Sequence, residues 1–365
     1  MLPDLPMQTS KLLTRRQKPR KEDIRGPYFR DQTAILHSFA FRRLKHKTQV
    51  FFSPDNDHIC TRIEHSLHLS TIAATICKAL GLNLEIAQAA GLGHDLGHAP
   101  FGHCGESTLK VLSDNGFQHE LHSLRVIDKL EEMGQGLNLT FAVRDAIVSH
   151  CGEQDEQYIE VAEVPNDLDN LQKLPASPST WEGCVLRISD SIAYLGRDME
   201  DAIHSQCISR NDIPVEVVQK LGPTNSQIIK SLVNDCIDWS MKKGKIGLSE
   251  ETFGVIKILK NFSRSKIYKN PKLEYWNRYA DFVLKSLYNY LIELLGKNEK
   301  DFDKYESSAI ELGQKFGKFI QKFDNFYINE SASENLIVID YIAGMSDKYA
   351  IKCFDNLLST GTTKF

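Results

Sequence analysis

The sequence lacks the features that mark disulfide-stabilised, zinc-ribbon or membrane proteins. None of its eight cysteines forms a C-x-x-C pair, which argues against a zinc ribbon or a disulfide framework and suits a reducing compartment. No apolar run approaches the length of a membrane span, and residues 1–23 lack the apolar core of a signal peptide. The sequence therefore predicts a cytoplasmic protein with no membrane partner.

The chain also lacks an excess of either charge. Its 365 residues carry a formal net charge of −4, so no general basic field indicates a nucleic-acid partner. The basic run at 11–21 is interpreted as part of a solvated N-terminal lead-in over residues 1–27, although contact with single-stranded nucleic acid stays open there. The aromatic stretch at 275–295 leaves the same alternative open, but its helical spacing favours a core or a subunit interface.

Strand signals are scarce, whereas helical periodicity runs through the chain. Between residues 61 and 80 apolar side chains recur at spacings that a helix gathers on one side, and Gly81 follows as a typical helix end. The proline-containing stretch at 152–179 is the clearest loop. Further helices are predicted at 84–95, 104–113, 120–134, 139–150, 180–204, 214–220, 224–243, 250–262, 272–296, 303–324 and 333–357.

These elements predict an all-α protein. We expect one helical catalytic core over residues 28–205, followed by a helical C-terminal extension over residues 206–365 that packs on the core. No internal repeat is present, and no linker sets the extension apart.

Histidine is concentrated early in the chain, where eleven of the twelve precede residue 151. In the segment GLGHDLGHAPFGH at 91–103, His94 and Asp95 are adjacent, so on a helix they diverge by about 100° and flank one ion only from its end or edge. The glycines around them clear space for a close approach. His65 lies on an apolar helical face, where a lone histidine is more often a core residue with hydrogen-bond partners than a metal ligand.

Asp190 is a second polar residue on an apolar helical face. A buried carboxylate is costly without a partner, and the neighbours of Asp190 in RISDSIAYLGRD are largely apolar. One cation bound by two imidazoles and two carboxylates would satisfy His65, His94, Asp95 and Asp190. Such a set of nitrogen and oxygen ligands suits Mn, Fe, Co, Mg or Zn and does not choose among them.

These residues carry a resemblance to a known family. His65, the pair His94–Asp95 and Asp190 reproduce the H…HD…D pattern of the HD superfamily of metal-dependent phosphohydrolases. Their flanks resemble the deoxyguanosine triphosphate triphosphohydrolases (dGTPases or dNTPases) of that superfamily. The matching blocks stand in the family's order and span most of the chain: FRRLKHKTQVF at 41–51, TRIEHSLHLS at 61–70, GHDLGHAPFGHCGE at 93–106, GFQHELHSLRV at 116–126, GLNLT at 136–140, ISDSIAYLGRDMEDAI at 188–203 and DYIAGMSDKYAI at 340–351.

The resemblance implies an HD-domain helical core and metal-dependent hydrolysis of deoxynucleoside triphosphates, dGTP or several dNTPs, to deoxynucleoside and inorganic triphosphate, with water attacking the α-phosphate. It implies that the four residues of the H…HD…D pattern bind a divalent metal. It also implies roles for residues that match the family's motifs: His103, Glu106 and His119 as catalytic residues, and Gln49, Arg62, His98, Tyr194, Asp198 and Tyr268 as substrate-binding residues.

A dNTP carries about four negative charges at neutral pH, so its site needs cations. Besides the metal and Arg62, the sequence offers Lys45, Lys47 and Arg125. Two rival functions stay open: another HD phosphohydrolase, either a nucleotidase or a phosphodiesterase, and a nucleotide-sensing or nucleic-acid-binding regulator. A nucleotide activator is a further open partner, and the resemblance implies a homo-oligomer.

Overall fold

The computed structural model describes residues 2–3, 9–17, 19–21, 23–51, 58–151 and 155–362. The predicted lead-in and the start of the predicted loop at 152–179 therefore lie partly outside the described residues. Within the lead-in, Arg15 forms an ion pair with Asp31, with 2.6 Å between Nη1 and Oδ1 and both side chains buried. Arg15 therefore packs on the core, whereas Lys11, Arg16 and Lys21 of the same basic run are exposed.

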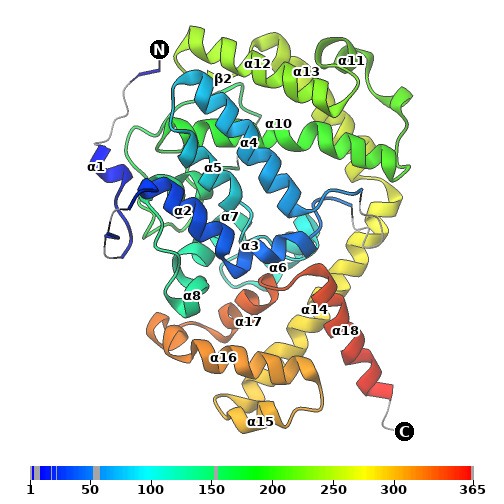
Figure 1. The fold of residues 1–365 in the computed structure, drawn as a ribbon. Helices are drawn as coiled ribbons and strands as arrows, with labels where there is room; N and C mark the ends of the chain where they lie inside the picture. Colours follow the sequence, from blue (N-terminus) through cyan, green and yellow to red (C-terminus); the bar gives the residue numbers. More distant parts are fainter. Residues whose placement is uncertain are drawn as a thin grey trace.

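Helices make up most of the described chain, which confirms the all-α prediction (Figure 1). The first half contains α1 (Thr9–Leu12), α2 (Gly26–His37), α3 (Phe39–Arg43), η1 (Leu44–His46), α4 (Arg62–Leu80), α5 (Leu84–Gly93), α6 (Gly102–Leu112), α7 (His119–Arg125), η2 (Val126–Leu130), α8 (Glu131–Gly134), α9 (Phe141–Val148) and α10 (Trp181–His204). The second half contains η3 (Arg210–Asp212), α11 (Val215–Leu221), α12 (Asn225–Lys243), α13 (Glu250–Phe262), η4 (Ser263–Tyr268), α14 (Pro271–Asn298), α15 (Phe302–Glu306), α16 (Glu311–Glu330), α17 (Glu334–Ala343) and α18 (Asp347–Thr362). Two short strands, β1 (Tyr158–Ile159) and β2 (Ile246–Gly247), pair antiparallel.

Several boundaries differ from those predicted. No helix was predicted where α2 and α3 lie, and the predicted helix at 303–324 is split into α15 and α16. The predicted helix at 333–357 is split into α17 and α18, because Ser346 interrupts it and its hydroxyl accepts a hydrogen bond from the backbone of Tyr349 at 3.3 Å. Apolar periodicity continues across such breaks, so it does not reveal them. Gly81 ends α4 in the left-handed conformation as predicted, with φ of +72°.

The apolar side chains form two main clusters. The larger one joins α2, α4, α5, α9 and α10 to α11–α13, for example through Ile228 and Leu232 of α12. The second joins α14, α16, α17 and α18 to Ala99 and Leu109 from the α6 region. Helices α11–α13 thus share the core of the N-terminal half, and the division of the chain at residue 205 stays a proposal.

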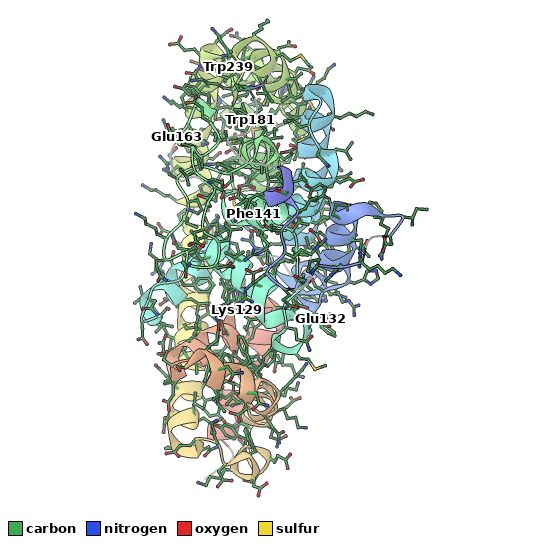
Figure 2. The ribbon with its side chains drawn as sticks, turned by 90° about the vertical axis from the view of Figure 1, so that its left-hand side faces the viewer. Lys129, Glu132, Phe141, Glu163, Trp181 and Trp239 are labelled. Atoms are coloured by element: carbon green, nitrogen blue, oxygen red, sulfur yellow. The ribbon has the colours of Figure 1, made fainter. Side chains whose placement is uncertain are left out.

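The side view in Figure 2 shows an elongated molecule, with Trp181 and Trp239 in its upper part and Lys129 just above α16. Lys129 of η2 forms an ion pair with Glu330 at the end of α16, and this ion pair links the first half of the chain to α16. Among the described residues, no helix is both long enough and apolar enough to cross a membrane.

Close packing of α4, α5 and α10 places the polar site. A Cβ added at Gly91 on α5 would lie 2.8 Å from Cα of Ser70 on α4, so glycine is needed for the two helices to approach this closely. At Gly97 an added Cβ would lie 2.1 Å from the backbone nitrogen of Ser123. The turn after α5 is therefore pressed against α7, and the histidines of both segments face each other.

Candidate metal centre and active site

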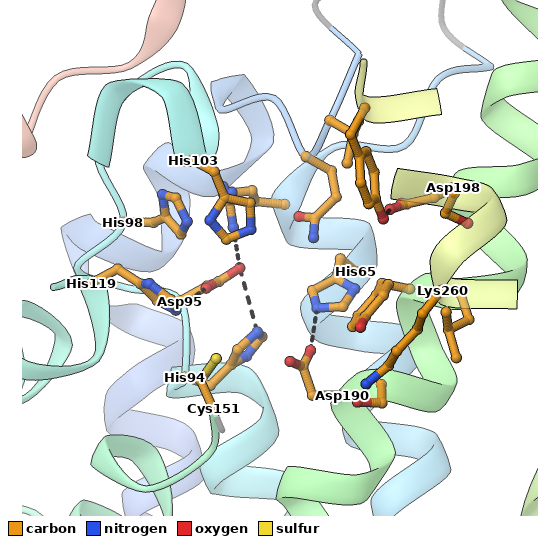
Figure 3. A pocket seen from close by; sticks show the side chains of 18 of the residues that line it. His65, His94, Asp95, His98, His103, His119, Cys151, Asp190, Asp198 and Lys260 are labelled. Atoms are coloured by element: carbon orange, nitrogen blue, oxygen red, sulfur yellow. Dashed lines mark hydrogen bonds and ion pairs between the residues drawn. The ribbon is translucent and has the colours of Figure 1, made fainter. Parts of the chain in front are cut away.

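The four residues of the H…HD…D pattern come together from three elements (Figure 3). The ligand atoms of His65 on α4 and of His94 and Asp95 at the end of α5 lie within 4.8 Å of one another. Asp190 on α10 faces them, with its Oδ1 3.0 Å from Nε2 of His65. Burial would raise the pKa of Asp190, but the hydrogen bond with His65 and the charges of His65, His94 and His150 together outweigh it and lower the pKa to about 2.

The residues fit a divalent metal ion. Nδ1 of His94 is hydrogen-bonded to the carbonyl oxygen of Gly91 at 2.8 Å, which leaves the lone pair of Nε2 for a metal. That Nε2 atom is buried and forms no hydrogen bond among the described residues, and the carboxylate nearest to it in an ion pair is that of Asp95, with Oδ2 at 3.4 Å. A buried imidazole nitrogen is costly to leave unpaired, and a cation shared with two carboxylates removes that cost.

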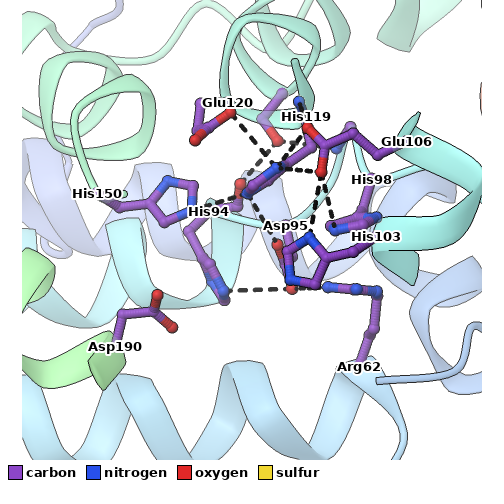
Figure 4. A network of polar contacts seen from close by, with 12 residues as sticks. Arg62, His94, Asp95, His98, His103, Glu106, His119, Glu120, His150 and Asp190 are labelled. Carbon is purple, nitrogen blue, oxygen red and sulfur yellow. Dashed lines mark hydrogen bonds and ion pairs between the residues drawn. The ribbon is translucent and has the colours of Figure 1, made fainter. Parts of the chain in front are cut away.

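A network of histidines and carboxylates lies beside this centre (Figure 4). Glu106 on α6 joins the two histidines that the resemblance makes catalytic. The Oε2 atom of Glu106 is 3.3 Å from Nδ1 of His103. The Oε1 atom of Glu106 is 3.0 Å from Nδ1 of His119, and it also accepts a 2.8 Å hydrogen bond from the backbone nitrogen of His119. Burial would lower the pKa of His119, but the charges of Glu120 and Glu106 outweigh it and raise the pKa to about 9.

Arg62 is buried at the start of α4 and pairs with Asp95, with 2.5 Å between Nη1 and Oδ2. Its Nε and Nη2 atoms have no hydrogen-bond partner among the described residues, and neither has Oε1 of Gln49 or Nε2 of His98. All three residues border the same cavity. Unpaired buried donors and acceptors that border one cavity indicate a polar ligand.

Opposite the metal centre, α10 and η4 supply a second polar group. The hydroxyl of Tyr268 donates a 2.6 Å hydrogen bond to Oδ2 of Asp198, and Tyr194 lies one helical turn before Asp198. Burial raises the pKa of Asp198 to about 6, and the bond from Tyr268 opposes that rise. This group faces the same space as His65 and Asp190.

The candidate site residues from the sequence meet at one cavity of about 460 Å³. All of them line it except Glu106, which lies behind His103 and His119. The residues brought together on its wall are Gln49, Arg62, His65, His94, Asp95, His98, His103, His119, Asp190, Tyr194, Asp198 and Tyr268.

The sequence reasoning missed several lining residues, among them His150, Arg187 and Lys260. His150 has its Nε2 3.3 Å from Nε2 of His119, and burial and the neighbouring His94 lower its pKa to about 3, which leaves the ring neutral. Its only signal in the sequence is its place among the early histidines. Arg187 on α10 and Lys260 on α13 add cations to the wall. A lysine on an amphipathic helix gives no sign of which partner it faces, so Lys260 could not be singled out.

The additional phosphate-binding cations suggested by the sequence do not line the cavity. Lys45 is exposed. Lys47 is buried and donates to the carbonyl oxygens of His98 and Ala343. Arg125 is held by Asp340 and Glu330. That suggestion is wrong for Lys47 and Arg125 because residues far along the chain bind their charged groups.

Comparison with known proteins shows which family the chain resembles. A family model described as "HD domain" matches residues 62–195, and a model described as "Phosphohydrolase-associated domain" matches residues 246–356. Relatives in Caldanaerobacter subterraneus subsp. tengcongensis and Clostridium tetani are both named deoxyguanosinetriphosphate triphosphohydrolase-like protein. They are 38% and 36% identical to this chain, covering 92% and 93% of it and 86% and 88% of their own lengths. A relative of the same name in Rickettsia peacockii is 30% identical over 92% of both chains.

Proposed function

We propose a function that proceeds from one premise: the chain belongs to the family of deoxyguanosinetriphosphate triphosphohydrolase-like proteins, whose HD domain is that of metal-dependent phosphohydrolases. The proposal is hydrolysis of dNTPs, dGTP or several, to deoxynucleoside and inorganic triphosphate. The observation that carries it is a single cavity that borders the four candidate metal ligands, a buried arginine and a tyrosine–aspartate group. Its volume of about 460 Å³ lies within the range of small-molecule sites.

The candidate ligands of the metal are His65, His94, Asp95 and Asp190. A divalent cation held there would supply Lewis-acid polarisation of a phosphoryl oxygen. Manganese, magnesium, iron, cobalt and zinc all suit this set of nitrogen and oxygen donors. Arg62 already offsets the charge of Asp95, and its unpaired Nε and Nη2 are donors for a phosphate oxygen.

Proton transfer falls to the histidines next to the metal centre. His103 is the most exposed of them and stands at the cavity wall, so its ring can reach the O5′ atom that leaves the α-phosphorus. Glu106 accepts from Nδ1 of His103 and thereby directs Nε2 of that ring away from itself. His119, which carries a proton because of Glu120 and Glu106, adds positive charge beside the phosphates. His98 and Gln49 are left to bind substrate through their unpaired atoms.

The tyrosine–aspartate group, which consists of Tyr194, Asp198 and Tyr268, selects the sugar. Tyr268 bonds one oxygen of Asp198, which leaves the other oxygen to accept from a sugar hydroxyl. The ring of Tyr194 stands one turn away on the same helix and covers the face of a deoxyribose. A ribose 2′-hydroxyl placed against that ring finds no partner, and such an unpaired polar group costs about 1–3 kcal/mol.

Product analysis tests the proposal. The purified protein is incubated with Mn²⁺ and each dNTP in turn, and the products are separated by ion-exchange chromatography, with Asp190→Ala as the control for contaminating phosphatases. Deoxynucleoside with intact triphosphate is the expected result. Deoxynucleoside monophosphate with pyrophosphate, or diphosphate with phosphate, would place the substrate in another register and refute the roles given to His103 and Arg62.

Two rival functions make different predictions in the same assay. Hydrolysis of nucleoside monophosphates or cyclic dinucleotides in preference to dNTPs would favour another HD phosphohydrolase. Nucleotide binding without any turnover would favour a sensor. The cytoplasmic location, the homo-oligomer, the nucleotide activator and the contact with single-stranded nucleic acid stay predictions from the sequence.

A further inference from the structure

The motif DYIAGMSDKYAI at 340–351 lies at the junction of α17 and α18, and none of its residues lines the catalytic cavity. Its two aspartates, Asp340 and Asp347, are nevertheless buried. We propose that Asp347 is a positioning residue for hydrolysis, which holds the turn at 97–102 against the segment at 47–49. The inference rests on the proposed function for its kinetic consequence and on hydrogen bonds for its geometry.

Asp347 is the first residue of α18, and its carboxylate bridges two distant segments. Its Oδ1 accepts from the backbone nitrogen of Phe101 at 2.9 Å, and its Oδ2 accepts from the backbone nitrogen of Thr48 at 2.8 Å. The residue is only 1% exposed, so these bonds do not compete with water. Figure 1 shows the start of α18 beside α6, where the first of these bonds is made.

Both bonded segments lead directly to candidate site residues. Phe101 precedes α6, on which His103 is the second residue, and Thr48 precedes Gln49. The backbone at Phe101 has φ of +64°, a left-handed conformation that costs free energy for a residue with a large side chain. The bond from Asp347 to the Phe101 nitrogen compensates for that cost and fixes the direction in which α6 begins.

Two further side chains tie the same turn to the C-terminal helices. Lys47, 2% exposed, donates to the carbonyl oxygen of His98 and, at 2.8 Å, to that of Ala343 at the end of α17. His122 joins the carbonyl oxygen of Gly97, 2.8 Å from its Nδ1, to Asp340, 3.3 Å from its Nε2. The turn is therefore attached at three points to residues 340–347, and Asp347 is the one that reaches it directly.

Packing makes the turn sensitive to small shifts. A Cβ added at Gly102 would lie 3.1 Å from the carbonyl oxygen of Gln49 and 3.3 Å from Nη2 of Arg62. The turn thus already touches two candidate substrate-binding residues, and a displacement of α6 by a fraction of an ångström would alter their spacing from His103. A misplacement of about 1 Å can cost about 10²-fold in rate, even from a change remote from the reacting atoms.

Only a carboxylate satisfies both backbone donors with one short side chain. In Asp347→Asn one oxygen is replaced by an NH₂ group, which faces a backbone N–H and cannot accept from it. Asp347→Ser keeps a single acceptor in a smaller side chain and is the second variant should the asparagine protein not fold. The matched control is Asn335→Ala: Asn335 on α17 donates to the carbonyl oxygen of Leu112 at 2.7 Å and so ties the C-terminal helices to the far end of α6.

The variants are compared by hydrogen–deuterium exchange of the peptides covering 45–51 and 97–104, by metal content and by steady-state kinetics with the preferred dNTP. For Asp347→Asn we expect faster exchange in both peptides, unchanged metal content and a kcat about 10–100-fold lower. For Asn335→Ala we expect faster exchange near residue 112 and a kcat close to that of the unaltered protein. A comparable fall in kcat in the control would make the role merely structural and overturn the inference.

The exchange measurement needs no substrate, so its result does not depend on whether the protein hydrolyses dNTPs. The proposed function and the positioning role of Asp347 can therefore be refuted separately. Unchanged exchange in both peptides of the Asp347 variant overturns the positioning role whatever the enzyme hydrolyses. Faster exchange with an unaltered kcat overturns it too, because the turn would then move without consequence for the reaction. Absence of dNTP hydrolysis by the unaltered protein refutes the proposed function and leaves the exchange result to decide the geometry.

Discussion

The variant His103→Ala tests proton transfer alone, because His103 has no other proposed role at the site. The His103 side chain is 72% exposed, and its only hydrogen bond given by the structure is the one to Glu106. His103 does not belong to the cluster of ligand atoms formed by His65, His94 and Asp95. Its removal therefore leaves the candidate metal ligands, Arg62 and the tyrosine–aspartate group in place.

The exposure of His103 also limits how much its substitution can change the stability of the protein. Substitutions at exposed positions usually change the free energy of unfolding by less than about 0.5 kcal/mol, so His103→Ala should fold and melt like the unaltered protein. A general acid is worth about 10²–10⁴-fold in rate, which corresponds to about 2.7–5.4 kcal/mol of activation free energy. A stability effect is thus too small to account for the expected fall in kcat.

A substrate whose leaving group needs no proton makes the test sharper. In a dGTP analogue with sulfur in place of O5′, the departing group is a thiolate, which is far less basic than an alkoxide because a thiol has a pKa of about 8.5. We expect His103→Ala to lose about 10²–10⁴-fold with dGTP and less than about 10-fold with the sulfur analogue, as measured in single-turnover experiments. Equal losses on the two substrates would show that His103 does not protonate the leaving group.

Three further predictions follow from the same contacts. Asp190→Ala should lose both its metal and its activity, because Asp190 faces His65 and His94 at the buried centre; full metal occupancy by elemental analysis would remove it from the ligand set. The unaltered protein should turn over dGTP about 5–150-fold faster than GTP, the equivalent of about 1–3 kcal/mol, and Tyr194→Ala should narrow the difference; equal rates for the two nucleotides before mutation would contradict the role of the tyrosine. Burial would raise the pKa of Asp340, but His122 and Arg125 outweigh it and lower the pKa below the ordinary value of 3.8, so this carboxylate stabilises the fold above that pH and the contribution is lost as the pH falls through the lowered pKa. Asp340→Asn should therefore reduce the free energy of unfolding by about 3 kcal/mol at pH 7 and by less near pH 3 in urea titrations, and an equal deficit at both pH values would argue against the ion pair.

The helical fold could be predicted because its signals are local. Apolar spacing with Gly81 as a stop gave α4 closely, and the left-handed φ at Gly81 is the physical reason that glycine stands there. The breaks at Ser346 and between α15 and α16 were missed because each depends on a cap or a turn that leaves the apolar periodicity unchanged. The resemblance supplied the candidate site residues, and the cavity then brought them together from segments up to about two hundred residues apart.

The sequence does not show which partner each charged side chain contacts. Lys47 and Lys260 are both lysines near apolar residues, yet Lys47 is enclosed against two carbonyl oxygens while Lys260 borders the cavity and meets Asp155 at 2.7 Å. The difference arises from helices that approach from the far end of the chain, and nothing in the local residue pattern encodes it. The same holds for Asp347, which acts on a turn almost 250 residues away because its helix begins there. Charged residues at such junctions therefore have to be assigned from contacts, and those that contact only backbone can still decide where a catalytic side chain lies.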